Sequence, residues 1–323
     1  MKPAKRTPRA RARLAALLLA AAGALPCRAD EGQGVPVETP DQSVHSRTSP
    51  YYFGPNAFPI PDILDKVSDR LRIGLAADCY TGFRGDLTGD LHLSINIPLW
   101  TRRANLSLWM PAVEWYRNSE RNMEVSGIAP AMREKARKGV LAGDVYVSAD
   151  LQVFEEARIR PDVTVRAALK TASGSGNDIG RYYDSPGYFF DAAVAKTFTV
   201  GNSGVALRGA LSAGFLCWQT ERDLQNDAVM FGALLRIDYR RFSLSGAFGG
   251  YVGWENIAYT DRRDSHDAPM SVKIKALYSF GMWEAFAQYQ RGVRDYPYNQ
   301  VRLGVSVGID ILKTRSADKT NQF

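Results

Sequence analysis

The sequence is poor in the residues that usually build metal and redox sites. It has three cysteines and three histidines in 323 residues, and His45, His92 and His266 are scattered along the chain. No group of Cys, His, Asp or Glu has the spacing of a metal site. No glycine-rich phosphate loop follows a strand and opens a helix. We therefore expect neither a metal nor a cofactor.

Long apolar runs are also missing. The longest, residues 14–25, is too short for a membrane-spanning helix, which needs about 20 residues. It follows a basic stretch and precedes Pro26-Cys27-Arg28-Ala29. This order predicts a secretory signal peptide, residues 1–29, cleaved near Ala29. Acylation of Cys27 as a lipoprotein is the less favoured alternative, because Pro26 stands where a small residue is wanted.

Removal of this peptide changes the charge balance. The whole chain has 41 basic and 34 acidic residues, whereas residues 1–29 contain seven basic residues and no acid, so 41 − 7 = 34 basic residues remain. The excess of basic residues therefore belongs to the export signal and gives no evidence for binding nucleic acid. Cys79 and Cys217 remain after cleavage, and we expect two free thiols.

Alternation of apolar and polar residues dominates the rest of the chain. In residues 91–97 (LHLSINI) every odd position is apolar and every even position is polar, the pattern of a strand with one apolar face. Twelve such runs occur, at 69–81, 86–99, 103–116, 141–154, 161–172, 188–199, 203–218, 227–239, 241–254, 269–279, 282–291 and 299–312. Each is long enough for a tilted transmembrane strand of about 9–11 residues.

The connections between these runs alternate in length. Short ones lie at 100–102, 201–202, 239–241 and 279–281, and long ones at 117–140, 172–187 and 255–268. Outer-membrane barrels have short periplasmic turns, long external loops and an even strand number. The sequence therefore predicts an all-β fold, a transmembrane antiparallel up-and-down β-barrel of about 12 strands, with both termini in the periplasm.

Aromatic residues at the strand ends favour this barrel over a soluble β-sandwich. They gather near the short turns and near the long loops, as in the two interfacial girdles of membrane barrels. The turn-side set is Trp100, Phe198, Tyr239 and Phe242, and the loop-side set is Trp115, Tyr188, Phe190 and Trp254.

Four stretches carry a resemblance to a known family: SPYYFGPNAFPIPD (49–62), MPAVEWYRNSE (110–120), DIGRYYDSPGYFFDA (178–192) and GGYVGWE (249–255). With them the mature chain resembles the outer-membrane β-barrel proteins of Bacteroidetes-type bacteria. The resemblance implies a barrel in the bacterial outer membrane and no assigned activity. One departure concerns the barrel-assembly machinery, an expected partner that reads an aromatic residue ending the last strand. Here the polar tail 313–323 separates Phe323 from that strand.

Residues 30–68 are rich in proline and precede the predicted barrel, 69–312. The aromatic residues Tyr51, Tyr52, Phe53 and Phe58 within them are costly to leave in water. A plug in the lumen, a periplasmic docking strip and a cap over the lower rim all remain open, and we favour the cap.

Two long loops carry further candidates. The basic loop 117–140, with Arg133, Lys135, Arg137 and Lys138, would suit lipopolysaccharide phosphates, although a solvated loop is the preferred interpretation. The glycine-rich loop 172–187 could fold inward as a constriction, which the sequence does not decide.

The sharpest chemical candidate is His92-x-Ser94-x-Asn96, three residues on one face of a strand. The arrangement is similar to that of outer-membrane phospholipases, in which His activates Ser and Asn orients the His. The apolar residues of this strand take the lipid side, however, so we favour three ordinary polar residues of the lumen.

Three functions remain open: a passive channel or small-solute transporter, a closed-lumen structural or assembly component, and a lipid-modifying hydrolase. The first is preferred, although the charges expected to point inward are balanced and suit a water-filled lumen and a salt-bridged, closed interior equally. These residues are Arg72, Asp78, Asp144, Asp150, Arg166, Lys170, Asp191, Arg208, Arg236, Asp238, Lys273, Lys275, Glu284, Arg302 and Asp310. Among them we expect Asp150 and Arg166 to form a cross-strand ion pair. Outer-membrane lipid and lipopolysaccharide are the expected partners.

Overall fold

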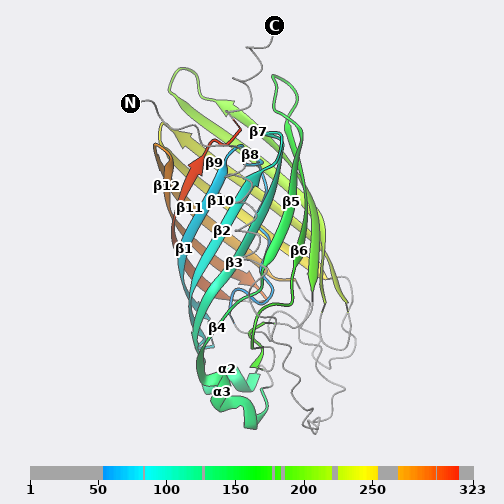
Figure 1. The fold of residues 1–323 in the computed structure, drawn as a ribbon, viewed down its shortest axis with the longest axis vertical. Helices are drawn as coiled ribbons and strands as arrows, with labels where there is room; N and C mark the ends of the chain where they lie inside the picture. The colour runs from blue at the N-terminus through cyan, green and yellow to red at the C-terminus, as the bar shows by residue number, and fades with distance from the viewer. Residues whose placement is uncertain are drawn as a thin grey trace, which may run out of the picture. The chain divides into compact units, whose positions relative to one another are not determined.

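The computed structural model describes residues 54–82, 84–125, 128–176, 179–182, 186–219, 225–253, 268–295 and 297–312. Thirteen strands make up one sheet (Figure 1): β1 (Leu71–Gly82), β2 (Leu87–Pro98), β3 (Ala104–Arg117), β4 (Lys138–Leu141), β5 (Tyr146–Phe154), β6 (Asp162–Lys170), β7 (Gly187–Thr199), β8 (Val205–Gln219), β9 (Gln225–Tyr239), β10 (Phe242–Gly253), β11 (Met270–Phe280), β12 (Trp283–Arg294) and β13 (Tyr298–Ile309).

The sheet closes on itself. Each strand pairs antiparallel with the next, apart from the β3–β4–β5 region, and β1 pairs with β13 from Leu71↔Ile309 to Gly82↔Tyr298. Both β4 and β5 pair with β3, so together they form one interrupted strand. The result is a closed antiparallel barrel of twelve strands, which confirms the predicted all-β antiparallel barrel and its strand number.

The interruption between β4 and β5 falls within the predicted strand 141–154. Pro111 lies opposite it in β3 and has no N–H to donate to a ladder. The register of β3 with β2 also shifts beside it, between Leu91 and His92. One bond bridges the interruption: the amide of Gly143 donates to the carbonyl oxygen of Pro111 at 2.9 Å. The other eleven predicted strands agree with the structure to within a few residues.

The two ends of the barrel differ. One end, here called the turn end, has short connections such as Arg240–Arg241 between β9 and β10, and β1 begins and β13 ends there. The opposite end, the loop end, has the β3–β4 connection with α2 (Glu120–Val125), the 3-10 helix η2 (Pro130–Met132) and α3 (Arg133–Arg137). In Figure 1 these helices lie below the strands. Met123, Ile128, Ala136 and Ile179 form a small buried core there.

No helix in the described part of the chain is both long and apolar enough to cross a membrane.

The two faces of the wall have opposite chemistry. Outward positions carry large apolar side chains that stay exposed, such as Leu211 at 68%, Leu303 at 58% and Ile274 at 57%. Inward positions carry charged groups that are buried, including Lys170 at 1% and Arg208 at 3% exposure. The barrel thus has an apolar outside and a charged inside.

Residues 54–70, here called the plug segment, run through the lumen in irregular conformation. Near the loop end the amide of Gly54 donates to Asp86, and near the turn end the amide of Val67 donates to Gln152. Between these points the segment contacts Arg208 and Lys273 on distant strands, as only a chain inside the barrel can. It therefore lies along the lumen. The sequence favoured a cap over the lower rim, and for these residues that prediction is wrong.

Candidate functional site

The lumen keeps a chamber of about 440 Å³ between the plug segment and the wall. This central chamber is lined by Pro59, Ile60 and Asp62 of the plug segment and by mostly polar wall residues such as Ser94 and Gln288. Its volume is within the range of small-molecule pockets, about 300–1,000 Å³. The candidate site is therefore this chamber together with the contacts that hold the plug segment against the wall.

Asp65 anchors the plug segment near the turn end. Its carboxylate accepts bonds from Nε of Arg208 at 2.7 Å and from Nη1 of Arg236 at 2.9 Å. Arg208 also donates to the Asp65 carbonyl oxygen at 2.6 Å and to Asp162 at 2.8 Å. Because β8 and β9 present the two arginines at paired positions, one carboxylate bridges both strands.

Asp62 anchors the middle of the segment. Its carboxylate pairs with the ammonium of Lys273 on β11, and its carbonyl oxygen accepts a bond from Arg166 on β6 at 2.6 Å. Beside it, the side chain of Ile63 packs so closely on Gly232 that a Cβ there would lie 2.7 Å from it. These contacts draw the segment against two different sectors of the wall.

The predicted ion pair between Arg166 and Asp150 is not formed. The two residues are cross-strand partners, yet Arg166 binds Asp191 on β7 through two bonds, of 2.7 and 3.0 Å. The Asp150 carboxylate accepts bonds from the hydroxyls of Ser107 and Ser148 instead, at 2.6 and 2.8 Å. Alternation placed both side chains inside, but it could not tell which neighbouring strand each would bind.

A buried network, here called the outer latch, holds the first residues of the plug segment at the loop end. Arg181, from the β6–β7 loop, is fully buried and donates to Glu114 on β3 at 2.7 and 2.9 Å, and to Asp86 at 3.2 Å. Asn56 of the plug segment donates to Glu114 and to Asp90. Gly54 has φ +77, and a Cβ there would lie 2.8 Å from the guanidinium.

Opposing effects set the charge of this latch. Burial lowers the pKa of the Arg181 guanidinium, but the carboxylates of Glu114 and Asp86 raise it more, so the group stays charged. Burial raises the pKa of Asp86, and Glu114 adds to this rise, while Arg181 and the Gly54 amide oppose it. The latch therefore depends on one guanidinium that neutralises a pair of buried acids.

Sequence reasoning missed most of this network. It raised the possibility that loop 172–187 folds inward, without singling out Arg181 as the residue that enters. Asp86, Asp90 and Glu114 were also absent from the expected lumen charges. A usable signal exists: the three acids lie near one end of adjacent strands, and Arg181 stands in a loop at the same end.

Other predicted lumen residues pair within the wall. Arg302 binds Asp78 at 2.8 Å, Lys170 binds Asp144 at 2.7 Å, and Arg72 binds Glu284. At the turn end, Arg236 binds Asp238 at 3.0 Å and Arg102 approaches Asp310 at 3.4 Å. Lys275 lies over the ring of Phe286 at 4.3 Å and makes no ion pair with another described residue.

His92, Ser94 and Asn96 of β2 all line the central chamber. Asn96 donates to the hydroxyl of Ser107 at 2.8 Å. Within the described part of the chain no hydrogen bond joins His92 to Ser94, the contact that an activated serine needs. Leu91, Leu93 and Ile95 lie on the outward face of this strand, opposite to the chamber. No group of His, Cys, Asp or Glu among the described residues has the geometry of a metal site.

Two cations of the basic loop 117–140 form ion pairs with acids of the same loop. Arg133 pairs with Glu124 at 3.4 Å, and Arg137 pairs with Glu120 at 2.5 Å. Cys79 and Cys217 are free thiols, as expected.

Most of the aromatic residues predicted at the strand ends are exposed where the structure describes them. Trp100, Phe198, Tyr239 and Phe242 are exposed at the turn end, Trp115 and Phe190 are exposed near the loop end, and Tyr188 is half-buried.

Phe58 packs inside the barrel against Trp218, with 6.3 Å between ring centres. The other aromatic residues of the proline-rich stretch 30–68 that were candidates for a plug or cap, Tyr51, Tyr52 and Phe53, lie outside the described residues. So do the proposed signal peptide 1–29, Trp254, and the tail 313–323.

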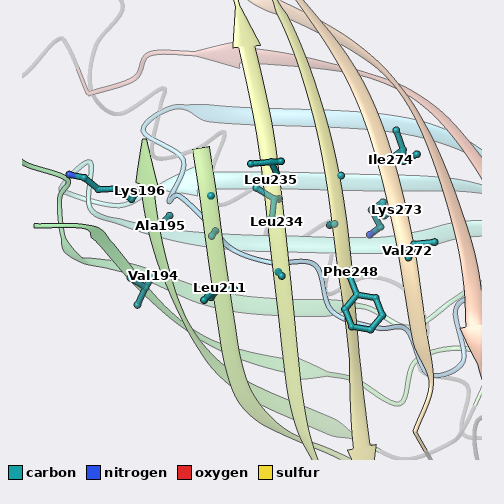
Figure 2. Close-up of a pocket in the computed structure, with 15 residues that line it drawn as sticks. Val194, Ala195, Lys196, Leu211, Leu234, Leu235, Phe248, Val272, Lys273 and Ile274 are labelled. Atoms are coloured by element: carbon teal, nitrogen blue, oxygen red, sulfur yellow. The ribbon is translucent and has the colours of Figure 1, made fainter. Parts of the chain in front are cut away.

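The outer wall has a shallow apolar hollow of about 690 Å³ across β7 to β11, shown in Figure 2. Gly209 and Gly246 leave it open, because nothing lies within 4 Å of a Cβ at either position. Leu211, Leu235 and Phe248 are among the residues that surround it.

No protein-family model matches this sequence. No curated protein matches it either. Among solved structures, it is similar to an outer membrane channel from Pseudomonas putida F1, with 14% identity, 77% of this chain and 99% of that chain covered, and a TM-score of 0.53. Two weaker likenesses are the NanC porin, with 9% identity, 73% and 98% coverage and a TM-score of 0.47, and the KdgM porin, with 10% identity, 73% and 98% coverage and a TM-score of 0.44. The first of these shows a shared fold: a closed antiparallel barrel of the kind found in an outer membrane channel.

Proposed function

We propose that this chain is an outer-membrane channel for small solutes, with a lumen narrowed by the plug segment. The observation that carries the proposal is the inverted chemistry of the wall. Side chains such as Leu211, Leu235 and Leu303 cover the outside, and water would be a poor solvent for so large an apolar surface. Ion pairs line the inside, where a membrane barrel has its polar lumen.

The dimensions of the strands support a membrane span. Most strands have 11 to 15 residues, as in β11 and β8. At about 3.3 Å per residue and a tilt near 40°, 12 residues rise about 30 Å, close to the thickness of the hydrocarbon layer. The outward aromatic residues at both strand ends would then lie at the two interfaces.

The fold shared with the Pseudomonas putida channel supports the outer membrane as the location. In this proposal the loop end, with α2 and α3, faces the outside of the cell. The turn end, where β1 begins and β13 ends, faces the periplasm. Export would depend on the signal peptide 1–29, and lipopolysaccharide and the barrel-assembly machinery remain proposed partners.

A channel is favoured over a closed structural barrel by the space left inside. The central chamber has about 440 Å³, and the side chain of Asp62 is 67% exposed although it lies within the barrel. Around Asp62 and Asp65 the plug segment is held by polar contacts, Phe58 packs in an apolar cluster with Trp218, and no described strand pairs with the segment. The polar contacts exchange with water and ions more readily than the apolar cluster does.

The test is conductance across a planar bilayer. Asp65→Asn removes the charge that bridges Arg208 and Arg236, and hydrogen bonds to charged groups contribute about 1.5–3 kcal/mol. The fraction of time spent in a larger conductance should therefore rise by about 10- to 150-fold. Deletion of residues 54–66 should give that larger conductance steadily.

The matched control is Asp69→Asn. Asp69 is a half-exposed acid at the turn end, with contacts of 3.5 Å to Arg70 and 3.8 Å to Arg102, so its loss should leave the conductance unchanged. Folding of each variant is checked by its heat-dependent migration in gels. The channel would be refuted, and the closed-lumen structural component favoured, if the wild type, Asp65→Asn and the deletion of residues 54–66 all showed no conductance at high protein load.

A further inference from the structure

Three cations lie together on one sector of the lumen wall. Lys275 on β11 is the cross-strand partner of Gln288 on β12, which is in turn the partner of Arg302 on β13. Lys273 lies two positions from Lys275 and therefore points to the same side of β11. Lys273, Lys275 and Arg302 all line the central chamber, and we name them the cationic wall.

The barrel wall only partly neutralises these cations. Asp78 on β1 binds Arg302 at 2.8 Å, and the neighbouring Asp90 carboxylate accepts a bond from Asn56 at 2.9 Å. Lys275 lies over the ring of Phe286 and makes no ion pair with another described residue. Lys273 has a carboxylate partner, but this partner is Asp62, which belongs to the plug segment and not to the wall.

Asp62 thus brings a carboxylate to the cationic wall. Its side chain is 67% exposed, so the contact with Lys273 is open to the chamber rather than sealed by packing. The backbone of Asp62 is held separately, through its carbonyl oxygen and Arg166 at 2.6 Å. The carboxylate can therefore be displaced without releasing the main chain at this position.

We propose that the cationic wall is a binding site for a small solute that bears a carboxylate, and that Asp62 occupies this site when no solute is bound. The inference rests on the proposed channel and names its substrate class. A solute carboxylate would take the place of the Asp62 carboxylate on Lys273, with Lys275 within reach as a second cation. Neutral groups of the chamber, such as the Ser94 hydroxyl and the Gln288 amide, are available to hydroxyl groups of the same solute.

The size of the chamber limits the solute. About 440 Å³ lies at the lower part of the range for small-molecule pockets, so a molecule of about the size of one sugar ring suits it. A charge-assisted contact to Lys or Arg is stronger than a neutral hydrogen bond. An acidic sugar should therefore bind in preference to its neutral counterpart.

The experiment is calorimetric titration of the full mature chain in detergent with sodium glucuronate and, separately, with glucose. We expect saturable binding of glucuronate and at least tenfold weaker binding of glucose. The double variant Lys273→Gln/Lys275→Gln should lose at least tenfold in affinity for glucuronate. Lys138→Gln, an exposed lysine at the loop end, is the control and should bind as the wild type does.

Asp62→Asn gives the decisive result, because it predicts a gain that a misfolded variant could not produce. Without the competing carboxylate, glucuronate should bind about tenfold more tightly or better. Equal affinity of the wild type and Asp62→Asn, equal binding of glucose and glucuronate, or no saturable binding by either protein would each overturn the inference. Binding of glucuronate does not depend on conduction. Absence of conductance in the bilayer would therefore refute the channel, whereas the calorimetric titration tests the carboxylate site independently.

Discussion

Replacement of Arg181 should open the outer latch while the barrel stays folded. Arg181 is fully buried, and its bonds to Glu114 and Asp86 are the only ion pairs that those two acids make within the described part of the chain. Met at this position keeps an unbranched side chain of similar length but leaves two buried carboxylates without their cation. Breaking a buried ion pair from one side costs about 3–5 kcal/mol.

That energy sets the size of the expected effect. At 1.4 kcal/mol per factor of ten, local opening of the latch should become roughly 10² to 4 × 10³ times more frequent in Arg181→Met. The probe is hydrogen exchange of the Gly54 amide, which donates to Asp86 at 2.8 Å, and of the Arg181 amide, which donates to Gly176 at 3.0 Å. Protection of both amides should fall together, since local openings expose contiguous groups of amides.

Two further variants make this measurement decisive. Arg181→Lys keeps the charge but loses the planar fork that holds Glu114 through two bonds, so it should give an intermediate loss. Arg133→Met removes a partly exposed pair with Glu124, which is worth at most about 1 kcal/mol, and is the control. Protection that stays within threefold of the wild type in Arg181→Met would show that the latch does not hold the loop and the plug segment.

Two other predictions use different measurements. Ser94→Ala should leave the phospholipids and lipid A of the membrane unchanged, because Ser94 lines the lumen and makes no hydrogen bond with His92 in the described structure; mass spectrometry of extracted lipids checks this, and deacylated lipid that depends on Ser94 would refute it. In a chain with Cys79→Ser and Cys217→Ser, a membrane-impermeant maleimide should label Glu134→Cys on intact cells, because Glu134 is exposed at the loop end. Asn202→Cys in the short β7–β8 turn should react only after the outer membrane is opened, and the reverse pattern would invert the proposed orientation.

The fold could be predicted from the sequence because a barrel with an apolar outside and a polar inside alternates apolar and polar residues along each strand. In β2 and β13 the alternation of residues is almost unbroken, so both the strand and the face of each residue follow from it. The interruption between β4 and β5 was not predicted. Pro111, which lies opposite it, is inside a predicted strand of its own. Alternation alone describes one strand at a time and says nothing of the partner across the gap.

The site was less accessible to sequence reasoning, and the reason is physical. The direction of Arg166 followed from period two, but its choice of Asp191 over Asp150 depends on rotamers and on distances across the lumen. The entry of Arg181 depends on the path of an irregular loop, which has no periodicity. The location of the plug segment is equally nonlocal, since its contacts with Gln152 and Lys273 join residues far apart in the chain.

The path of the plug segment also constrains the order in which the barrel can assemble. Residues 54–70 run from the loop end to the turn end and continue directly into β1, whose pairing with β13 completes the ring. If the ring closed first, residues 54–70 would have to enter a lumen already crowded by Trp218, Arg208 and their neighbours. Closure of the β1–β13 pairing around a segment that is already inside avoids this step, so we expect insertion of the segment and closure of the ring to occur as a single folding event.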